Sequence, residues 1–486
     1  MRKNLFVLVV MSLIILLSTA EREKSPPATS PTADGYRGIW YGGKEYGGGF
    51  ALFPSQHSPS AVYRPEVKKT FFVYGGTVAG KRQLQAMASY YDHERDVVPR
   101  PTIVHDWGEW NLKPGQVSDA YRNPTLSVDG GGYVWVFVSG HSDLGYVYRA
   151  RKPYSVESFE QVIATPMTYP NPWWIPKKGF FVFLTRYDHA RESFWITSPD
   201  GKKLADSETW KTPGQLNAWT MGSEGNTYGH GIYQFTGAHG SRVATVMNNW
   251  IGRTRDRSNF FYLQSDDVGK TWQTADGKDF TPPIREVKCR ALVRDFWGEH
   301  LQVYLQHLTF DRQGRPAILF LTSPAGQTNE GPGGPRTWTV AHWVGDRWAF
   351  HAVTTSSHNF DCGSLYIEDD GIWRIIGPTE PGPQRWRTGG EIAMWTSNDQ
   401  GSTWKKLKQL TTGSPYNHCH VRRPVDAHPD FYGLWADGDG NNKSSPSQLY
   451  FCNKAGTVRV LPQTMSGAFA QPAILDRKSE TQPKHR

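Results

Sequence analysis

The sequence is poor in cysteine, in helical periodicity and in clustered charge, and each shortage narrows the class of protein. Four cysteines are few for a chain of 486 residues, and they leave open two disulfides, one disulfide with free thiols, or part of a metal site. Long amphipathic helical patterns are absent, and only residues 83–91 and 156–164 are candidates for helical turns. No Lys/Arg tract or nucleic-acid-binding motif occurs, which disfavours a nucleic-acid partner.

The first residues have the composition of an export signal. Met1–Asn4 is basic, Leu5–Leu17 is apolar, and Ser18–Ala20 supplies the small residues that a signal peptidase needs. We therefore expect residues 1–20 to be a cleaved signal peptide and the protein to be secreted or periplasmic. The alternative is a retained membrane anchor, for which the apolar run is short. No cysteine follows the run, which disfavours a lipoprotein, and no later segment is apolar enough to cross a bilayer.

The remaining chain reads as one large unit with short polar ends. Residues 21–34 are rich in Pro, Ser and Thr, and we expect them to form a disordered linker. Residues 479–486 form a polar tail. No second linker of this kind interrupts residues 35–478, which are expected to be a single catalytic domain that acts as a monomer.

Aromatic residues and turn-forming residues are abundant. The chain is 13% aromatic and contains 49 Gly and 33 Pro, which fits short strands and long loops. Strand-like runs bounded by Gly, Pro, Asn or Asp include Lys69–Tyr74, Tyr133–Val138, Phe180–Leu184 and Ala317–Leu321. Aromatic faces also suit sugar binding, although most of these rings are expected to pack the interior. The pattern predicts an all-β fold.

One eight-residue pattern occurs twice. Ser265–Trp272 and Ser397–Trp404 both fit Ser-x-Asp-x-Gly-x-Thr-Trp, the Asp-box. The pattern is typical of a tight turn between strands, in which the Asp carboxylate accepts backbone N–H bonds, the Gly takes a positive φ and the Trp packs under the hairpin. Repeated hairpins of this kind predict a β-propeller, whose blades bury their faces against one another.

Weaker repeats support the propeller. Ser198–Gly201 resembles a degenerate Asp-box, and acidic turns precede strands at Asp129, Asp311 and Asp369. At about 45–65 residues per blade, the two complete boxes are two or three blades apart and the chain holds about six to eight blades. We predict a seven-bladed β-propeller. Its ring is expected to close by pairing of Gly35–Tyr41 with the C-terminal region.

The formal net charge of the chain is +9, and the basic residues are scattered. A diffuse positive field attracts anionic partners. An acidic or sulfated polysaccharide fits this field better than a nucleic acid does, and we expect such a glycan to be the partner.

Tyr121 and His141 flank one predicted strand–turn–strand unit, which can place both side chains at the same rim. Binding and catalytic residues concentrate on loops, and in a propeller loops converge at one end of the central channel. A Tyr/His pair there can perform acid–base chemistry, with His as a base near neutral pH and Tyr as a proton donor or, when deprotonated, a base. The alternative is a turn tyrosine and a hydrogen-bonded loop histidine.

A second candidate segment follows an apolar strand and contains Arg186, Tyr187, His189 and Arg191. Arg can neutralise a carboxylate by bidentate hydrogen bonding, and Tyr can protonate a leaving oxygen. The alternative is a solvated charged loop.

Histidine and cysteine concentrate in two further loops. His358, Cys419 and His420 suit a tetrahedral zinc site closed from both loops, although no CxxC or HExxH pattern is present. A Cys362–Cys419 disulfide or carbohydrate-contacting histidines are the alternatives. No organic cofactor is expected.

Several longer segments are more distinctive: Gly35–Tyr41, Phe53–Pro59, Lys69–Gly76, Asn123–Pro124, Val136–Gly140, Ser357–Asn359 and Arg422–Tyr432. In these segments the chain resembles a known family, the Asp-box propellers that include ulvan lyases and rhamnose–glucuronate lyases. The likeness covers nearly the whole mature chain. These segments are more specific than the Asp-boxes, which sialidases and many other propellers also carry.

The resemblance implies a polysaccharide lyase on a seven-bladed propeller. Its substrate would be a glycan in which rhamnose, often sulfated, is joined 1→4 to uronic acid. The chemistry would be β-elimination, in which a base removes the C5 proton of the uronate, a cation or hydrogen bonds stabilise the carboxylate, and an acid protonates the departing O4.

The same resemblance suggests roles for the candidate residues. His141 would be the base or the carboxylate partner, Tyr187 the proton donor and Arg191 the carboxylate neutraliser. The expected substrate contacts are Asn123, His57, Arg186 and His189.

The chain departs from the family pattern at one position. Ulvan lyases of this kind are expected to carry two histidines about twenty residues apart, and here the second corresponds to His141 while the first falls on Tyr121. Either Tyr121 takes the first role beside the subsite, or His57, Tyr187 or His189 takes it. Relatives that remove terminal rhamnose are similar around His57 and are expected to have Arg in place of His141.

Two other classes of protein remain open. A sialidase-like or rhamnosidase-like glycoside hydrolase would share the fold, but the Arg triad and the acidic/Tyr pair of sialidases do not emerge from the spacing. A non-catalytic glycan-binding propeller would also be basic, aromatic and exported.

Overall fold

The computed structural model describes residues 29–42, 47–48, 57–79, 81, 83–109, 121–141, 143–186, 192–203, 214–217, 228–251, 256–329, 331–442 and 444–475. The predicted signal peptide and polar tail lie outside these ranges. Within them the regular structure consists of strands, and no helix there is long and apolar enough to cross a membrane.

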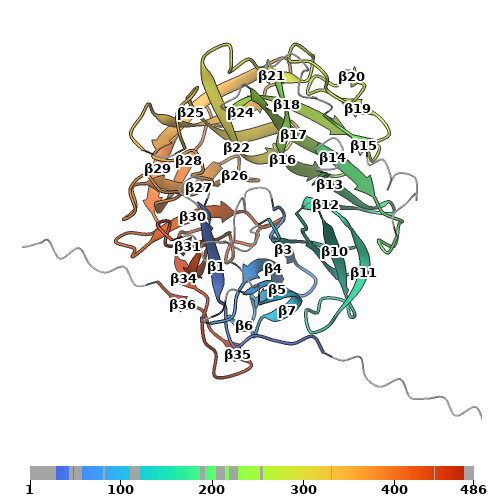
Figure 1. The fold of residues 1–486 in the computed structure, drawn as a ribbon, viewed down its shortest axis with the longest axis vertical. Coiled ribbons are helices and arrows are strands. Elements are labelled where there is room, and N and C mark those ends of the chain that lie inside the picture. Colours follow the sequence, from blue (N-terminus) through green and yellow to red (C-terminus); the bar gives the residue numbers. More distant parts are fainter. Residues whose placement is uncertain are drawn as a thin grey trace, which may run out of the picture.

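Seven antiparallel sheets are arranged around one axis as a seven-bladed β-propeller, as predicted (Figure 1). Blade 1 comprises β1 (Gly38–Gly42), β2 (Gly47–Gly48), β3 (Ala61–Arg64), β4 (Lys69–Gly76), β5 (Gln83–Asp92), β7 (Thr102–Glu109) and β32 (Ser444–Ser447). Blade 2 comprises β8 (Pro124–Val128), β9 (Val134–Val138), β10 (Leu144–Ala150) and β11 (Phe159–Pro166). Blade 3 comprises β12 (Thr168–Ile175), β13 (Gly179–Thr185), β14 (Glu192–Ile196) and β15 (Gly214–Gln215).

The other four blades continue around the ring. Blade 4 comprises β16 (Tyr228–His239), β17 (Arg242–Ile251), β18 (Asp256–Ser265), β19 (Trp272–Gln273), β20 (Asp279–Phe280) and β21 (Leu292–Arg294), and blade 5 comprises β22 (Leu301–Phe310), β23 (Pro316–Pro324), β24 (Arg336–Trp343) and β25 (Trp348–Ser356). Blade 6 comprises β26 (Ser364–Ile367), β27 (Trp373–Glu380), β28 (Glu391–Ser397) and β29 (Lys405–Gln409). Blade 7 comprises β30 (Asn417–Arg422), β31 (Gly433–Gly438), β33 (Leu449–Cys452), β34 (Val458–Val460) and β36 (Ala473–Ile474), and a separate pair joins β6 (Val98–Pro99) to β35 (Phe469–Ala470).

The hydrophobic core is divided into seven clusters. Six of them lie between two neighbouring blades, and the seventh, between blades 5 and 6, also includes Tyr169 of blade 3 and Tyr233 of blade 4. Between blades 2 and 3, for example, the rings of Trp135 and Phe180 are 5.0 Å apart, and between blades 4 and 5 those of Phe260 and Phe320 are 5.1 Å apart. A blade covered on both faces needs apolar side chains on both faces. This requirement explains continuous runs such as β9, in which every residue is buried.

The ring closes through three contacts between the ends of the chain. Strand β1 pairs with β32, with Gly38 opposite Ser447 and Tyr41 opposite Ser444, which confirms the predicted pairing of this segment with the C-terminal region. Strand β35 pairs with β6 at the outer edge of blade 1 (Figure 1). The connection between β30 and β31 also crosses to blade 1, where Val425 forms a parallel bridge with Val62.

The two Asp-boxes form the turns that the sequence predicts. Asp267 Oδ1 accepts the backbone N–H of Thr271 at 2.9 Å, and its Oδ2 accepts the Thr271 hydroxyl at 2.7 Å. Gly269 has a φ of 80°, and Trp272 packs into the core between blades 3 and 4. The second box repeats these bonds around Asp399.

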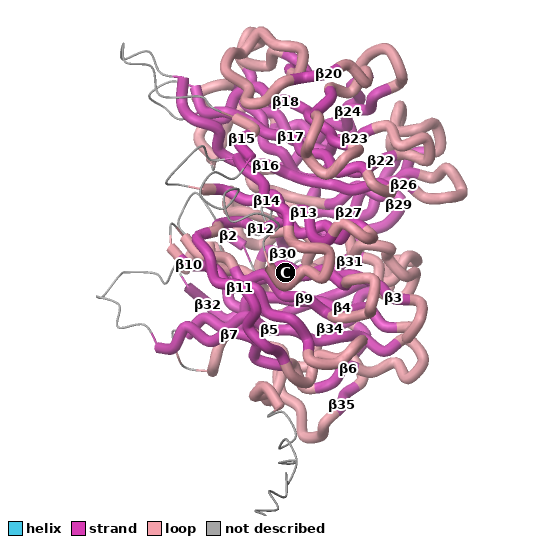
Figure 2. Tube along the Cα trace, turned by 90° about the vertical axis from the view of Figure 1, so that its right-hand side faces the viewer, coloured by secondary structure: helices cyan, strands magenta, loops and turns pink. Residues whose placement is uncertain are grey.

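Each complete Asp-box joins the third strand of its blade to the fourth. Strands run across the thickness of the disc, so their connecting loops lie at one of its two ends (Figure 2). Turns from strand 1 to 2 and from strand 3 to 4 share one end. The other end holds the loops from strand 2 to strand 3 and the segments that lead into the first strand of each blade. The first strands are the innermost ones, so they all start at that end.

The structure corrects two expectations. Residues 83–91 and 156–164 form no helical turns: the first range lies within β5, and most of the second lies within β11. β5 contains good helix formers, but pairing with β4 and β7 on its two edges outweighs their intrinsic preference. The predicted linker also ends earlier than residue 34, because Ala33 and Ile103 are held in backbone hydrogen bonds to Pro101 and Pro31.

An Asp267→Ala variant is expected to lose about 1 kcal/mol of stability, because it removes the acceptors of the turn hydrogen bonds. Thermal unfolding followed by circular dichroism measures the loss. Asp266→Ala is the matched control, since the neighbouring carboxylate only pairs with Arg242 at the surface. Equal melting temperatures for the two variants would show that the Asp-box bonds add no stability.

Candidate active site

The first strand of every blade starts at the same end of the propeller, and each blade places one aromatic or histidine ring close to that start. In order from blade 1 to blade 7 the rings are His57, Tyr121, Tyr169, Tyr233, Tyr304, Phe360 and His420. All except Tyr121 are buried. First strands of successive blades contact one another from β3 through β8, β12, β16 and β22 to β26, which brings the starts of blades 1 to 6 together around the axis.

The rings of blades 1 to 4 form a continuous arc. The centroid of Tyr169 lies 5.1 Å from that of His57, 5.5 Å from that of Tyr121 and 6.0 Å from that of Tyr233. Tyr169 has a φ of 52°, and a β-bulge interrupts β12 beside it. Left-handed backbone at a bulky residue costs about 1–3 kcal/mol, and such strain clusters at functional sites.

Tyr121 and His141 lie at the same rim, which confirms the predicted placement. Their rings are stacked with centroids 3.8 Å apart and an interplanar angle of 8°. The His141 backbone N–H donates to Asp143 Oδ1 at 2.8 Å, and Asp143 also pairs with Arg122. These contacts fix the 2-to-3 loop of blade 2 against the entry into its first strand.

His57 lies directly behind this pair. Its Nε2 is 3.0 Å from the Tyr121 carbonyl oxygen. His57 also lines a small cavity of about 10 Å³ together with Asn123 and Arg422. His57 of blade 1, Asn123 of blade 2 and Arg422 of blade 7 therefore line the same internal cavity.

Arg422 and Asn123 bring unpaired polar groups into this space. Among the described residues, Nε and Nη2 of Arg422 and both side-chain polar atoms of Asn123 have no hydrogen-bond partner. Burial lowers the pKa of Arg422 to about 10, and the guanidinium stays charged at neutral pH. A cavity of this size holds about one water molecule. A sugar would therefore bind outside it, above a buried positive charge.

A second buried guanidinium lies farther around the axis. The Arg257 guanidinium carbon lies 4.5 Å from the Tyr233 centroid, 4.6 Å from that of Tyr304 and 4.5 Å from that of Phe360. Aromatic faces stabilise such a cation without neutralising its charge.

The second candidate segment is only partly described. Arg186 follows β13 and is buried. Tyr187, His189 and Arg191, which carry predicted roles as proton donor, substrate contact and carboxylate neutraliser, lie outside the described residues.

A buried carboxyl group organises the entry into blade 6. Asp361 Oδ2 accepts the backbone N–H of His358 at 2.8 Å, and Oδ1 accepts that of Gly389 at 2.6 Å. Burial raises the pKa of Asp361 to about 7, although these hydrogen bonds oppose the shift. The loop is thereby locked to the 2-to-3 loop of the same blade.

The predicted zinc ligands His358, Cys419 and His420 are all buried. Both ring nitrogens of His420 and Nε2 of His358 lack hydrogen-bond partners in the described part of the chain. Burial holds the pKa of each histidine far below its usual range, so both rings are neutral. The ligand atoms of these three residues do not, however, all lie within 4.8 Å of one another.

With this geometry in place, comparison with known proteins identifies the family. A family model described as "BNR repeat-containing family member" matches residues 85–361, more than half of the chain. The chain belongs to the BNR repeat-containing family. No curated protein sequence matches it.

Solved structures of polysaccharide lyases share the fold of this BNR propeller. An ulvan lyase of polysaccharide lyase family PL25 aligns with a TM-score of 0.69 and 15% identity over 87% of this chain and 96% of the other. An ulvan lyase of that family in complex with -[GlcA(1-4)Rha3S]- aligns with a TM-score of 0.67 and 16% identity over 86% and 96%. The polysaccharide lyase Uly1 aligns with a TM-score of 0.56 and 11% identity over 88% and 99%.

The structure contains no disulfide among Cys289, Cys362, Cys419 and Cys452, all of which are described. The Cys362–Cys419 pairing and the other disulfide alternatives are therefore corrected. Cys362 and Cys452 are buried, and burial raises the pKa of each thiol to about 12.

The sequence did not predict a role for Tyr169, Tyr233, Arg257 or Tyr304, and Arg422 entered the predictions only as the first residue of the segment Arg422–Tyr432. The three tyrosines each lie near the start of a blade's first strand. Such aromatic residues therefore recur along the sequence about once per blade. That recurrence is a usable signal once the blades are numbered. Arg257 offers no such signal, because it lies in the third strand of blade 4. It reaches the aromatic side chains of the neighbouring blades only in the folded propeller.

Thiol titration is expected to find four reactive cysteines in the unfolded, metal-free protein and at most one in the native protein. The native reactive thiol would be Cys289, the half-buried one. Mass spectrometry after alkylation at neutral pH, with and without denaturant, measures both numbers. Fewer than four thiols on unfolding would mean that a disulfide had formed.

Proposed function

We propose that the protein is a polysaccharide lyase that cleaves a rhamnose–uronate glycan of the ulvan type by β-elimination. The observation that carries the proposal is the stacked Tyr121–His141 pair, which His57 joins to a small cavity that Arg422 also lines. Two buried nitrogens of Arg422 lack hydrogen-bond partners among the described residues. Acid–base groups next to uncompensated positive charge are what elimination beside a carboxylate requires. The fold shared with ulvan lyases, one of them in complex with a glucuronate–rhamnose sulfate saccharide, supports the same substrate class.

The reaction balances without a redox partner. A base removes the C5 proton of the uronate, the electrons of that C–H bond form the C4=C5 double bond, and the C4–O4 bond breaks. An acid protonates the departing O4. Because the C5 proton is weakly acidic, the carboxylate must be neutralised as negative charge moves onto it.

We assign the acid–base roles at this rim. His141 serves as base or carboxylate partner, and Tyr121, in van der Waals contact with it, supplies the phenol that replaces the first histidine expected in ulvan lyases. Tyr187 is proposed as the proton donor and Arg191 as the direct carboxylate partner. The further substrate contacts proposed are Asn123, His57, Arg186 and His189.

Two buried arginines would add positive electrostatic potential to this site. Arg422 and Arg257 are each less than a tenth exposed, so solvent screens their field weakly. Arg422 lines the small cavity beside His57 and Asn123, and Arg257 lies against the rings of Tyr233, Tyr304 and Phe360. Their field would draw an anionic sugar to the rim and stabilise the enolate that forms there.

We also propose that the enzyme is exported and acts as a monomer. With a net charge of +9, it would attract a sulfated, uronate-rich polysaccharide outside the cytoplasm. No nucleic-acid partner or membrane anchor is part of this proposal.

We also propose a structural zinc ion at His358, Cys419 and His420. The unpartnered ring nitrogens of the two histidines fit such an ion, because buried polar atoms otherwise need a hydrogen bond. A bound zinc would hold the entries into blades 6 and 7 together. Loss of one zinc equivalent in a Cys419→Ser variant, measured by elemental analysis, tests this site.

Incubation with ulvan is expected to raise absorbance in the mid-ultraviolet, where an unsaturated uronate absorbs. His141→Ala should lower kcat/KM by at least about 100-fold, because it removes a general base or carboxylate partner. His239→Ala is the matched control, since His239 lies at the opposite end of β16.

The outcomes separate the classes of protein. New reducing ends without absorbance would indicate a glycoside hydrolase, and binding without either would indicate a glycan-binding propeller. Full lyase activity in His141→Ala would remove the assignment of that residue.

Arg422→Met is expected to lower lyase activity about tenfold or more while leaving stability unchanged or higher. A desolvated charge without a partner costs folding energy, and replacing it by an apolar side chain removes that cost. Paired measurements of kcat/KM and melting temperature decide the matter. A variant that unfolds at lower temperature with normal activity would show that Arg422 has a structural role instead.

A further inference from the structure

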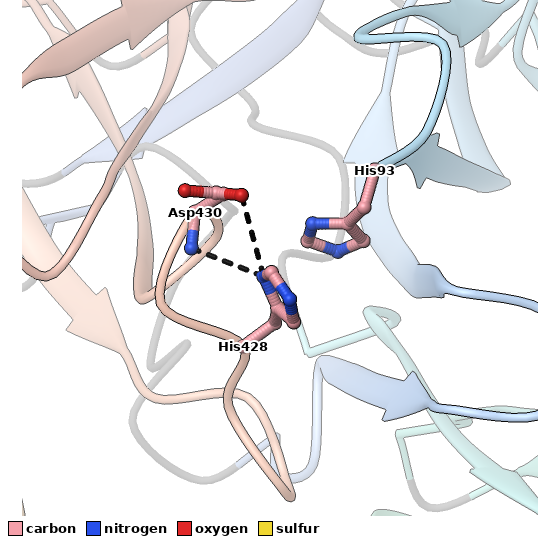
Figure 3. Close-up of side chains that lie close together, drawn as sticks. All are labelled: His93, His428 and Asp430. Atoms are coloured by element: carbon pink, nitrogen blue, oxygen red, sulfur yellow. Dashed lines mark hydrogen bonds and ion pairs between the residues drawn. The ribbon is translucent and has the colours of Figure 1, made fainter.

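Three side chains able to bind a metal converge at the end of the propeller opposite the candidate active site (Figure 3). His93 directly follows β5 in blade 1, and His428 and Asp430 lie in the connection between β30 and β31 of blade 7. Among the described residues this is the one group of three or more such side chains whose ligand atoms all lie within 4.8 Å of one another. None of the three has a part in the proposed reaction.

The two segments are held rigidly against each other at the junction of blades 7 and 1. The Val425 N–H donates to the Ala61 carbonyl at 2.9 Å, and the Tyr63 N–H donates to the Val425 carbonyl at 3.0 Å. The Phe431 ring is stacked on Phe72 with centroids 5.6 Å apart. The donor atoms are therefore fixed near one another before any ion binds.

His93 is oriented as a metal ligand usually is. Its Nε2 lies 2.8 Å from the buried Thr70 hydroxyl, while its Nδ1 is buried and has no hydrogen-bond partner in the described part of the chain. When the Nε2–H donates to Thr70, Nδ1 carries the free lone pair. Metal-ligating histidines commonly have their second nitrogen anchored in this way.

His428 and Asp430 complete the group from the other blade. The rings of His93 and His428 have centroids 4.0 Å apart, and Asp430 Oδ2 lies 3.7 Å from His428 Nδ1. Asp430 also lines a surface cavity of about 580 Å³, with Pro429, Asn453 and Lys454 among its walls. An ion can therefore reach the group from solvent.

We propose that His93, His428 and Asp430 bind a divalent first-row transition-metal ion, with zinc as the expected occupant and water completing its shell. Two imidazoles and a carboxylate suit such an ion and disfavour calcium or magnesium, which prefer oxygen ligands. With metal–ligand distances of about 2.0–2.2 Å, tetrahedral ligands lie about 3.3–3.6 Å apart, so small side-chain rotations close the site.

The ion would act as a clamp on the ring. It would link the third strand of blade 1 to the 1-to-2 connection of blade 7, next to the backbone bridge at Val425. Because the ligands come from both ends of the chain, the metal would stabilise the closed propeller against opening at this junction.

Metal-stripped protein titrated with zinc chloride should bind zinc by isothermal titration calorimetry and melt at a higher temperature when loaded. His93→Ala and His428→Ala should each lose one zinc equivalent and weaken binding at this site at least about 100-fold. Thr70→Val should weaken it about 10- to 100-fold while keeping all three ligands, because it removes the anchor of His93. Unchanged zinc stoichiometry and affinity in His428→Ala would overturn the proposal.

Cobalt substitution separates this site from the one proposed around Cys419. Cobalt bound by His93, His428 and Asp430 should show visible ligand-field bands without a thiolate-to-metal charge-transfer band, and these bands should persist in Cys419→Ser. Circular dichroism of the metal-free variants controls for folding. If all bound cobalt is lost in Cys419→Ser, or anomalous diffraction places no metal beside His93, the clamp does not exist.

Discussion

Every blade of this protein is apolar on both faces, and that constraint governs the rest of the molecule. A sheet with two apolar faces is stable only when both are covered, and the seven clusters of the core show that neighbouring blades supply the cover. The first and last blades have no sequence neighbour, so the ring must close on itself. Closure uses β1 with β32, the β6–β35 pair and the bridge from Val425 to Val62. An open ring would expose two complete apolar faces.

Closure also determines where chemistry can occur. All seven first strands enter from one end, so each blade brings one side chain to the axis and residues far apart in sequence become neighbours. The ring is rigid enough to hold strained backbone there, as at Tyr169 and His420, whose φ angles are 52° and 55°. Bulges beside both residues turn their side chains away from the regular alternation of a strand. The opposite end, with the Asp-box turns, carries local hydrogen bonds that stabilise hairpins.

The sequence predicted the features that depend on local chemistry. The Asp-box bonds, the number of blades, the closing role of Gly35–Tyr41 and the meeting of Tyr121 with His141 all follow from short segments or from one hairpin. The expected helical turn at residues 83–91 failed because strand pairing on both edges outweighs composition. His93 and His428 lie in the first and last blades, so their contact exists only after closure. No local pattern could have indicated it.

The energetics of Arg422 bear most directly on function. A guanidinium that is 5% exposed, with two nitrogens that lack hydrogen-bond partners in the described part of the chain, is costly to fold. Its burial already lowers its pKa to about 10, which shows that the surroundings disfavour the charge. A neutral side chain would pack more stably between Asn123 and His57. Under the proposed function an anion bound near the rim would offset this cost, and a uronate carboxylate placed beside His141 would supply that charge. Under the proposed function the buried cation, rather than the aromatic surface, is therefore the feature that would stabilise the charge developing on the carboxylate during elimination.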